Sequence, residues 1–215
     1  MSWFLLAMAC GSGIRCPEDM VGVVGEKGPF CIHQFEVQVV GPLGNRDQGV
    51  GFPDGSTRGK PQAKKGGTPT LASWYQAHAV CTGAGFSLCT SRQWEDACDG
   101  LPGAGGRKYP TQGEKAGPGV CAIGDLSRFE KIPLAKSGAF PACRTPEGVY
   151  DLMGNLWEWA DPGQKDAAGL PQIDKRGGGH YGAEAVPCTY GSPGSHAPSF
   201  DGTIGFRCCI SAVGG

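Results

Sequence analysis

Alternation of apolar and polar residues marks the first part of the chain as β-structure. Residues 20–24 are mostly apolar, and an apolar–polar alternation runs through residues 30–40, which is the period of a half-buried strand. A Gly-Glu-Lys-Gly segment separates these two stretches and suits a turn. We therefore expect a hairpin of two strands, which Cys16 and Cys31 flank and are placed to link.

Two helices are expected from their end signals and from the spacing of their apolar residues. The first is predicted over about 69–81, with Thr68 as its N-cap and a proline at its first position. The second is predicted to begin at Thr90, where Gln93 completes a capping box, and to end at Gly100.

The rest of the chain reads as loops followed by a closing strand. Glycine and proline are abundant, at 38 and 17 residues, and they follow no collagen period. Long loops are expected over 41–67 and 101–148, and a last strand over 203–213. At 215 residues one domain is expected. We assign it to residues 16–215, after a signal-like and flexible segment at 1–15.

The charge and the cysteine content limit which classes of partner and which cellular compartment are expected. The 19 basic and 20 acidic residues nearly cancel, which argues against a nucleic-acid partner or a polybasic membrane contact. Eleven cysteines without a Cys-x-x-Cys pair fit disulfides better than zinc, so an oxidising compartment is expected. The disulfide candidates are Cys16, Cys31, Cys81, Cys89, Cys98, Cys121, Cys143, Cys188, Cys208 and Cys209.

The eleventh cysteine, Cys10, ends a short apolar run and is followed by Gly-Ser-Gly. This pattern resembles a bacterial lipoprotein signal, in which Cys10 is lipidated and a lipid anchor is the only membrane contact. The alternative is a plain secretory signal. Either interpretation predicts an extracytoplasmic protein, periplasmic or on the cell surface.

An acidic residue stands on each side of a Gly-Asn turn in the segment 149–159. The spacing of Asp151 and Glu158 lets both carboxylates approach one point, with the turn carbonyls between them. Hard oxygen ligands gathered in this way suit a calcium ion. The alternative is that Glu158 pairs with a nearby arginine while Asp151 caps a turn.

This segment resembles the Gly-Asn-x-Trp-Glu-Trp block of the formylglycine-generating enzyme, or sulfatase-modifying factor, family. Gly205-Phe206-Arg207-Cys208 is similar to that family's closing strand, and 88–95 is similar to its second-helix block. The resemblance implies an α+β, C-type-lectin-like fold with twisted antiparallel strands, two helices and long ordered loops. It also implies a structural calcium ion held by Asp151, Glu158 and the carbonyls of Gly154 and Leu156.

The resemblance also shows what this chain lacks. In the active oxidases an Arg-Gly-Gly-Ser segment is followed by two cysteines that bind Cu(I), a metal suited to soft thiolates. Here the first cysteine position falls near Gly182, and Cys188 is the only cysteine of the segment. Cys188 is therefore a weak catalytic candidate, and copper is not expected. We expect Cys188 to form a disulfide with Cys208 or Cys209, on the closing strand.

These observations predict a non-catalytic, extracytoplasmic module that binds a glycan or a partner protein. Trp157, His180 and Tyr181 are expected to line its groove, which corresponds to the active-site groove of the oxidases. The alternative function is a copper-dependent oxidase that converts a sulfatase cysteine to formylglycine. The missing cysteine pair favours the first function over the second.

Overall fold

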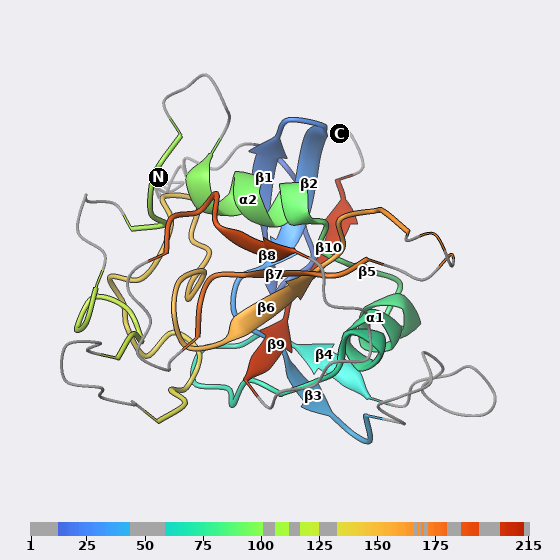
Figure 1. The fold of residues 1–215 in the computed structure, drawn as a ribbon, viewed down its shortest axis with the longest axis horizontal. Helices are drawn as coiled ribbons and strands as arrows, with labels where there is room; N and C mark the ends of the chain where they lie inside the picture. The colour runs from blue at the N-terminus through green and yellow to red at the C-terminus, as the bar shows by residue number, and fades with distance from the viewer. Residues whose placement is uncertain are drawn as a thin grey trace, which may run out of the picture.

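The computed structural model describes residues 13–43, 59–100, 106–111, 117–124, 133–165, 167, 169, 172–179, 186–193 and 203–212. Its first sheet has the strand order β1-β2-β10-β5, with antiparallel pairing throughout (Figure 1). These strands are β1 (Met20–Gly25), β2 (Gly28–His33), β5 (Ser87–Leu88) and β10 (Cys208–Ser211). The sheet joins the start of the domain to its end.

Two further sheets complete the β-structure of the described residues. The pair β3 (Gln38–Val40) and β4 (Lys60–Gln62) is antiparallel. The third sheet has the order β8-β7-β6-β9, in which β9 runs parallel to β6. Its strands are β6 (Trp157–Ala160), β7 (Asp174–Arg176), β8 (Gly191–Pro193) and β9 (Ile204–Phe206).

The expected hairpin is confirmed, but the strand expected over 30–40 is interrupted. It leaves the sheet after His33, and the N–H of Gln34 donates to the carbonyl of Asp19. The N–H of Val37 then bonds to Phe206 before β3 begins. Hydrogen bonds to distant segments therefore replace a continuous ladder over 34–37.

Helix α1 (Trp74–Gly83) begins five residues later than the sequence indicates. Ser73 caps it in a capping box with Gln76, and Thr68 is not the cap. Tertiary hydrogen bonds keep the preceding residues out of the helix, because the N–H groups of Thr70 and Ala72 donate to the carbonyls of Val37 and Ile204. The capping signal at 68–69 therefore does not start the helix, because the residues after it bond to distant segments.

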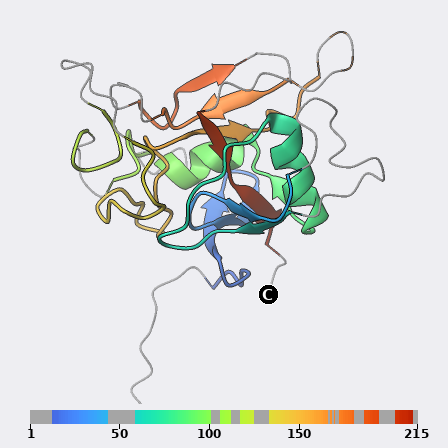
Figure 2. The ribbon, with the colours of Figure 1, turned by 90° about the horizontal axis from the view of Figure 1, so that it is seen from below.

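Helix α2 (Ser91–Asp99) follows the prediction closely. Thr90 and Gln93 form the capping box, and Gly100 ends the helix in a left-handed conformation. The buried face of α2 carries Trp94, Ala97 and Cys98, as expected. In Figure 2 the helix lies between the β1–β2 hairpin and the β7–β8 strands, and it contacts β1 and β7.

The closing strand expected over 203–213 is two strands that belong to different sheets. Strand β9 pairs with β6, and β10 pairs with β2 and β5. Arg207 lies at the switch between them and is fully buried. The chain therefore ties the first and third sheets together at one buried, charged residue.

The loop predictions are partly confirmed. The described parts of 101–148 contain no helix or strand, whereas 41–67 contains the short strand β4, which the sequence analysis missed. Among the described residues no helix is both long enough and apolar enough to cross a bilayer. The segment 1–12, including Cys10, lies outside the described residues.

Candidate functional site

The Gly-Asn turn at 154–155 is held against two other loops. Asp151 and Asn155 both have left-handed backbones, with φ of +57° and +58°. The N–H of Gly154 donates to Gly177 at 2.9 Å, and that of Asn155 donates to Ala122 at 2.8 Å. Left-handed conformations are uncommon outside glycine, although Asn and Asp tolerate them best. The surrounding loops therefore fix the direction in which the acidic side chains leave this turn.

Asp151 is buried at the start of the turn, with 3% of its surface exposed. Its Oδ2 atom accepts a hydrogen bond of 2.6 Å from the N–H of Gly138. Burial raises the pKa of Asp151 to about 6, and the Gly138 hydrogen bond opposes that shift. The side chain thus does what the alternative interpretation expected, because it holds a neighbouring loop.

Glu158 is buried at the other end of the segment and is engaged through both oxygens. Nε of Arg207 lies 2.8 Å from Oε1 and 2.9 Å from Oε2, and Nε1 of Trp94 donates to Oε2 at 2.8 Å. Burial raises the pKa of Glu158, whereas Arg207 and Trp94 favour its charged form. The pairing of Glu158 with an arginine, which the alternative expected, is therefore present.

The calcium donors named from the sequence are all buried in this segment. Asp151, Gly154, Leu156 and Glu158 belong to one continuous, buried stretch of chain. In the described part of the chain, no group of three or more His, Cys, Asp or Glu side chains could hold a metal ion. Any cation here would depend largely on main-chain oxygens, and calcium at this turn stays a prediction.

A third buried carboxylate, Glu36, was missed by the sequence analysis. It is 1% exposed, and its Oε2 atom accepts a 2.6 Å hydrogen bond from Nδ2 of Asn155. Burial raises its pKa well above the ordinary value, and the charges of Asp151 and Glu158 raise it further. Glu36 stands at a polar position of the alternating stretch 30–40, which suggested an exposed side chain.

Cys188 is bonded to Cys98, which joins helix α2 to the segment before β8. The expected pairing of Cys188 with Cys208 or Cys209 is wrong. Successive residues of a strand point to opposite faces, so the neighbours Cys208 and Cys209 reach different partners. The described residues contain five disulfides, which are Cys16–Cys31, Cys81–Cys208, Cys89–Cys209, Cys98–Cys188 and Cys121–Cys143.

These bonds confirm the expected Cys16–Cys31 link and include all ten cysteines named as disulfide candidates. A sulfur atom in a disulfide is not a thiolate, and only the thiolate binds a soft metal or acts as a nucleophile. In this structure Cys188 therefore supplies no ligand for Cu(I).

Trp157, which the sequence predicted to line the groove, lies beside a second aromatic ring and an amine. The ring of Trp157 is half-buried, lies 6.1 Å from that of Tyr190 and has Nζ of Lys175 at 5.8 Å. Gly179 leaves room beside Trp157, because a Cβ there would lie 3.1 Å from Cδ1 of the indole. We call Trp157, Lys175 and Tyr190 the Trp157 surface.

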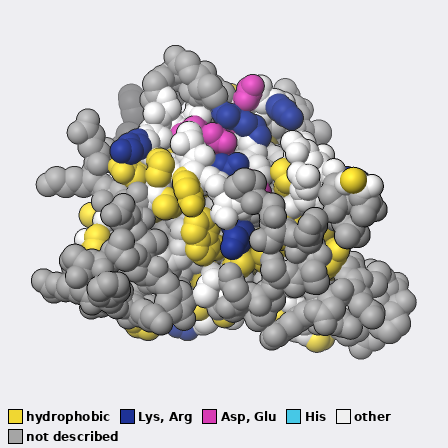
Figure 3. Space-filling model, in the orientation of Figure 1, with side chains coloured by type: hydrophobic (Ala, Val, Ile, Leu, Met, Phe, Trp, Pro, Cys, Tyr) yellow, Lys and Arg dark blue, Asp and Glu magenta, His cyan; other side chains and the backbone are white. Residues whose placement is uncertain are grey.

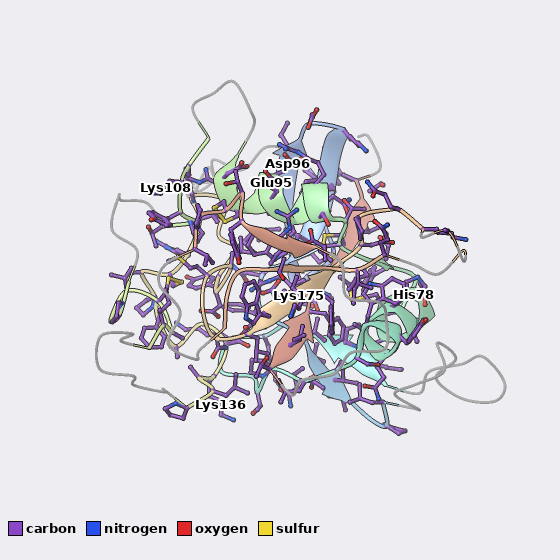
Figure 4. The ribbon with its side chains drawn as sticks, in the orientation of Figure 1. His78, Glu95, Asp96, Lys108, Lys136 and Lys175 are labelled. Atoms are coloured by element: carbon purple, nitrogen blue, oxygen red, sulfur yellow. A yellow bond between two sulfur atoms is a disulfide. The ribbon has the colours of Figure 1, made fainter. Side chains whose placement is uncertain are left out.

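The Trp157 surface is formed by β6, β7 and the residue that precedes β8. Lys175 lies near the centre of the face seen in Figure 4, and Figure 3 shows an apolar ridge with basic side chains beside it on that face. The other two groove residues named from the sequence, His180 and Tyr181, lie outside the described residues.

The chain is similar to known proteins over most of its length. A family model described as the sulfatase-modifying factor enzyme 1-like domain matches residues 32–212. The "Inactive C-alpha-formylglycine-generating enzyme 2" of Bos taurus is 32% identical over 155 residues, which is 65% of this chain and 49% of that protein. The "Hercynine oxygenase" of Mycobacterium tuberculosis is 32% identical over 88 residues, 40% of this chain and 20% of that protein.

The chain thus spans about half the length of the first of these relatives and a fifth of the second. Among solved structures, CarF superposes with a TM-score of 0.59 at 15% identity, covering 93% of this chain and all of CarF. The α+β, C-type-lectin-like fold of the formylglycine-generating-enzyme type, expected from the sequence, is confirmed. The match to residues 32–212 covers most of the chain, and the protein therefore belongs to the family of sulfatase-modifying factor enzyme 1-like domains.

Proposed function

We propose that this protein is a non-catalytic, extracytoplasmic module of its family. It is stabilised by disulfides and by calcium, and it binds a glycan or a partner protein through the Trp157 surface. The observation that carries the first part is the Cys98–Cys188 disulfide. This bond removes the one thiol of the segment that resembles the copper-binding segment of the active oxidases. A relative at 32% identity whose name calls it inactive supports the same conclusion.

The number of disulfides supports the proposed compartment. Five disulfides within one domain are typical of secreted, periplasmic or cell-surface proteins, because the cytosol keeps thiols reduced. Calcium is supported by the oxygen-rich donor set of Asp151, Glu158 and the turn carbonyls of Gly154 and Leu156. Its role would be to tie loops together without taking part in chemistry.

The binding role is supported by the chemistry of the Trp157 surface. Tyr190 is 47% exposed, and its ring lies 6.1 Å from that of Trp157. Tyr and Trp bury a large area at a low entropic cost and dominate the energetics of many interfaces. Both a glycan and a protein partner fit this combination.

Two measurements test the proposal. The purified, oxidised protein is incubated with copper and a Cys-x-Pro-x-Arg peptide, and aldehyde formation is followed. We expect no product. Aldehyde formation that is lost in Cys188→Ser would overturn the non-catalytic assignment and establish the oxidase.

The second measurement is binding on a glycan array and to candidate protein partners. Tyr190→Ser is compared with Val24→Ser, a control that is 46% exposed on strand β1, in a different sheet. We expect Tyr190→Ser to weaken binding by at least about tenfold, the effect of losing one interface hot spot. Equal binding by both variants would remove the Trp157 surface as the binding site.

A further inference from the structure

The charges buried around the Gly-Asn turn do not balance. Glu36, Asp151 and Glu158 are each at most 3% exposed, and Arg207, the partner of Glu158, is the one Lys or Arg that is buried among the described residues. Two negative charges are left over when all four groups are ionised. An unpaired charge in a low-dielectric interior is costly, so buried charges are paired or coordinate metals. A divalent cation bound here would supply the missing charge.

The three carboxylates differ in what their oxygens already contact. Both oxygens of Glu158 are engaged by Arg207 or Trp94. Oε1 of Glu36, in contrast, is fully buried and has no hydrogen-bond partner among the described residues. A buried carboxylate oxygen without a donor is rare in native proteins and often marks an ion or water position.

Glu36 also lies directly against the turn that carries the calcium candidates. Its other oxygen accepts from Nδ2 of Asn155, the residue between the candidate carbonyls of Gly154 and Leu156. Glu36, Asp151 and the turn carbonyls are all hard oxygen donors, and calcium takes six to eight of these, water included.

We propose that Glu36 supplies a carboxylate oxygen to a divalent cation held beside Asp151 at the Gly154–Asn155 turn. Glu36 then provides the second carboxylate of the site, while Glu158 remains the partner of Arg207. This inference rests on the calcium part of the proposed function and changes the donor set expected from the sequence.

Thermal unfolding of the full, oxidised protein in EDTA and in excess calcium tests the assignment. Glu36→Gln is the key variant, because glutamine keeps an oxygen that can accept from Asn155 and removes the charge. Glu147→Gln is the control, since Glu147 pairs with Arg107 at the surface. Calcium at a hundredfold excess over its Kd should raise the Tm of the wild type and the control by about 5–10 °C.

Glu36→Gln should lose this shift. In EDTA its Tm should equal or exceed that of the wild type, because one uncompensated buried charge is gone. If Glu36→Gln shifts as far as the wild type, Glu36 is not a ligand and calcium at the turn survives. If the wild type itself does not shift, both the calcium site and the role of Glu36 fail.

A crystal structure of the wild type grown with calcium gives an answer that needs no variant. The ion should lie within about 2.3–2.6 Å of a Glu36 oxygen. An ion bound by Glu158 and remote from Glu36 would overturn the assignment.

Discussion

Arg207 and Glu158 form an ion pair that is completely removed from water, with exposed fractions of 0% and 1%. The guanidinium also donates to the carbonyls of His33, Gln34 and Tyr150. Because Arg207 stands between β9 and β10, this one side chain connects the first sheet, the third sheet and the Gly-Asn turn segment. Its contacts fix the relative positions of three segments that are far apart in the sequence.

Breaking this pair should be among the most destabilising single changes. Arg207→Met leaves the Glu158 carboxylate buried without its main partner, and we expect a loss of about 3–5 kcal/mol in the free energy of unfolding. Arg107→Met is the matched control. It breaks the half-exposed pair of Arg107 with Glu147, which should cost less than about 1 kcal/mol. Urea unfolding of both variants gives the comparison, and similar losses would show that the buried pair has no special role.

His33 should make the protein sensitive to acid. Its Nδ1 atom accepts a hydrogen bond from the N–H of Cys208, which requires a neutral ring, and Nε2 lies 3.5 Å from Asp19. Burial lowers the pKa of His33 from 6.5 to about 4, with Asp19 opposing the shift and Arg207 adding to it. The unfolded chain therefore binds a proton between pH 6.5 and 4 that the folded protein does not.

The contribution of His33 to the free energy of unfolding is complete above pH 6.5. It is lost as the pH falls, by up to about 3 kcal/mol at pH 4. Four buried carboxyl groups contribute with the opposite sign, because burial raises the pKa of Asp99, Asp151, Glu36 and Glu158. A comparison at fixed pH removes that contribution. We expect the stability of His33→Asn to fall less than that of the wild type between pH 7 and pH 4.5. Parallel pH profiles would contradict the assignment, and His78→Asn serves as a control on helix α1.

The features that follow from neighbouring residues were predictable from the sequence. Thr90 and Gln93 stand three residues apart, so the start of α2 could be identified. Ser73 and Gln76 offer the same signal for α1, but Thr68 and the proline after it offer a competing start. The choice depends on hydrogen bonds from 70 and 72 to segments elsewhere in the chain, which no local pattern reveals.

The candidate site was predictable only in part, for a related reason. Asp151 and Glu158 lie in one motif, and their burial and proximity were expected. Glu36 and Arg207 approach that motif from residues that are 119 and 49 positions away from their partners in it. Glu36 sits at a polar position of an alternating stretch, so a surface location was the natural interpretation. Its burial results from the way the chain leaves the sheet after His33.

The disulfide pattern is open to direct measurement. Non-reducing peptide mapping by mass spectrometry should find Cys208 linked to Cys81 and Cys209 linked to Cys89, with Cys188 linked to Cys98. Replacing the last pair by Cys98→Ser with Cys188→Ser should cost about 2–5 kcal/mol. A free thiol at Cys188 in the mapped protein would undermine the non-catalytic assignment, because it restores a possible metal ligand.

Alanine variants of two glycines with nearly identical φ angles separate the effect of steric crowding from that of backbone strain. Gly154 and Gly66 have φ of +79° and +78°, so alanine at either position occupies a left-handed conformation at a cost of about 1–2 kcal/mol. At Gly154 a Cβ would lie 2.5 Å from the carbonyl oxygen of Ala122 and 2.8 Å from Cγ1 of Ile123. At Gly66 it would meet nothing within 4 Å.

Gly154→Ala must therefore displace the Ala122 loop, which should add about 1–3 kcal/mol of overpacking to the backbone term. The same displacement would disturb the hydrogen bond from Asn155 to Ala122 and, with it, the position of Asn155 against Glu36. We thus expect Gly154→Ala to weaken any calcium-dependent rise in Tm, while Gly66→Ala leaves that rise unchanged. Equal losses of stability in the two variants would mean that the turn has room to relax, and that its close packing does not set the geometry of the site.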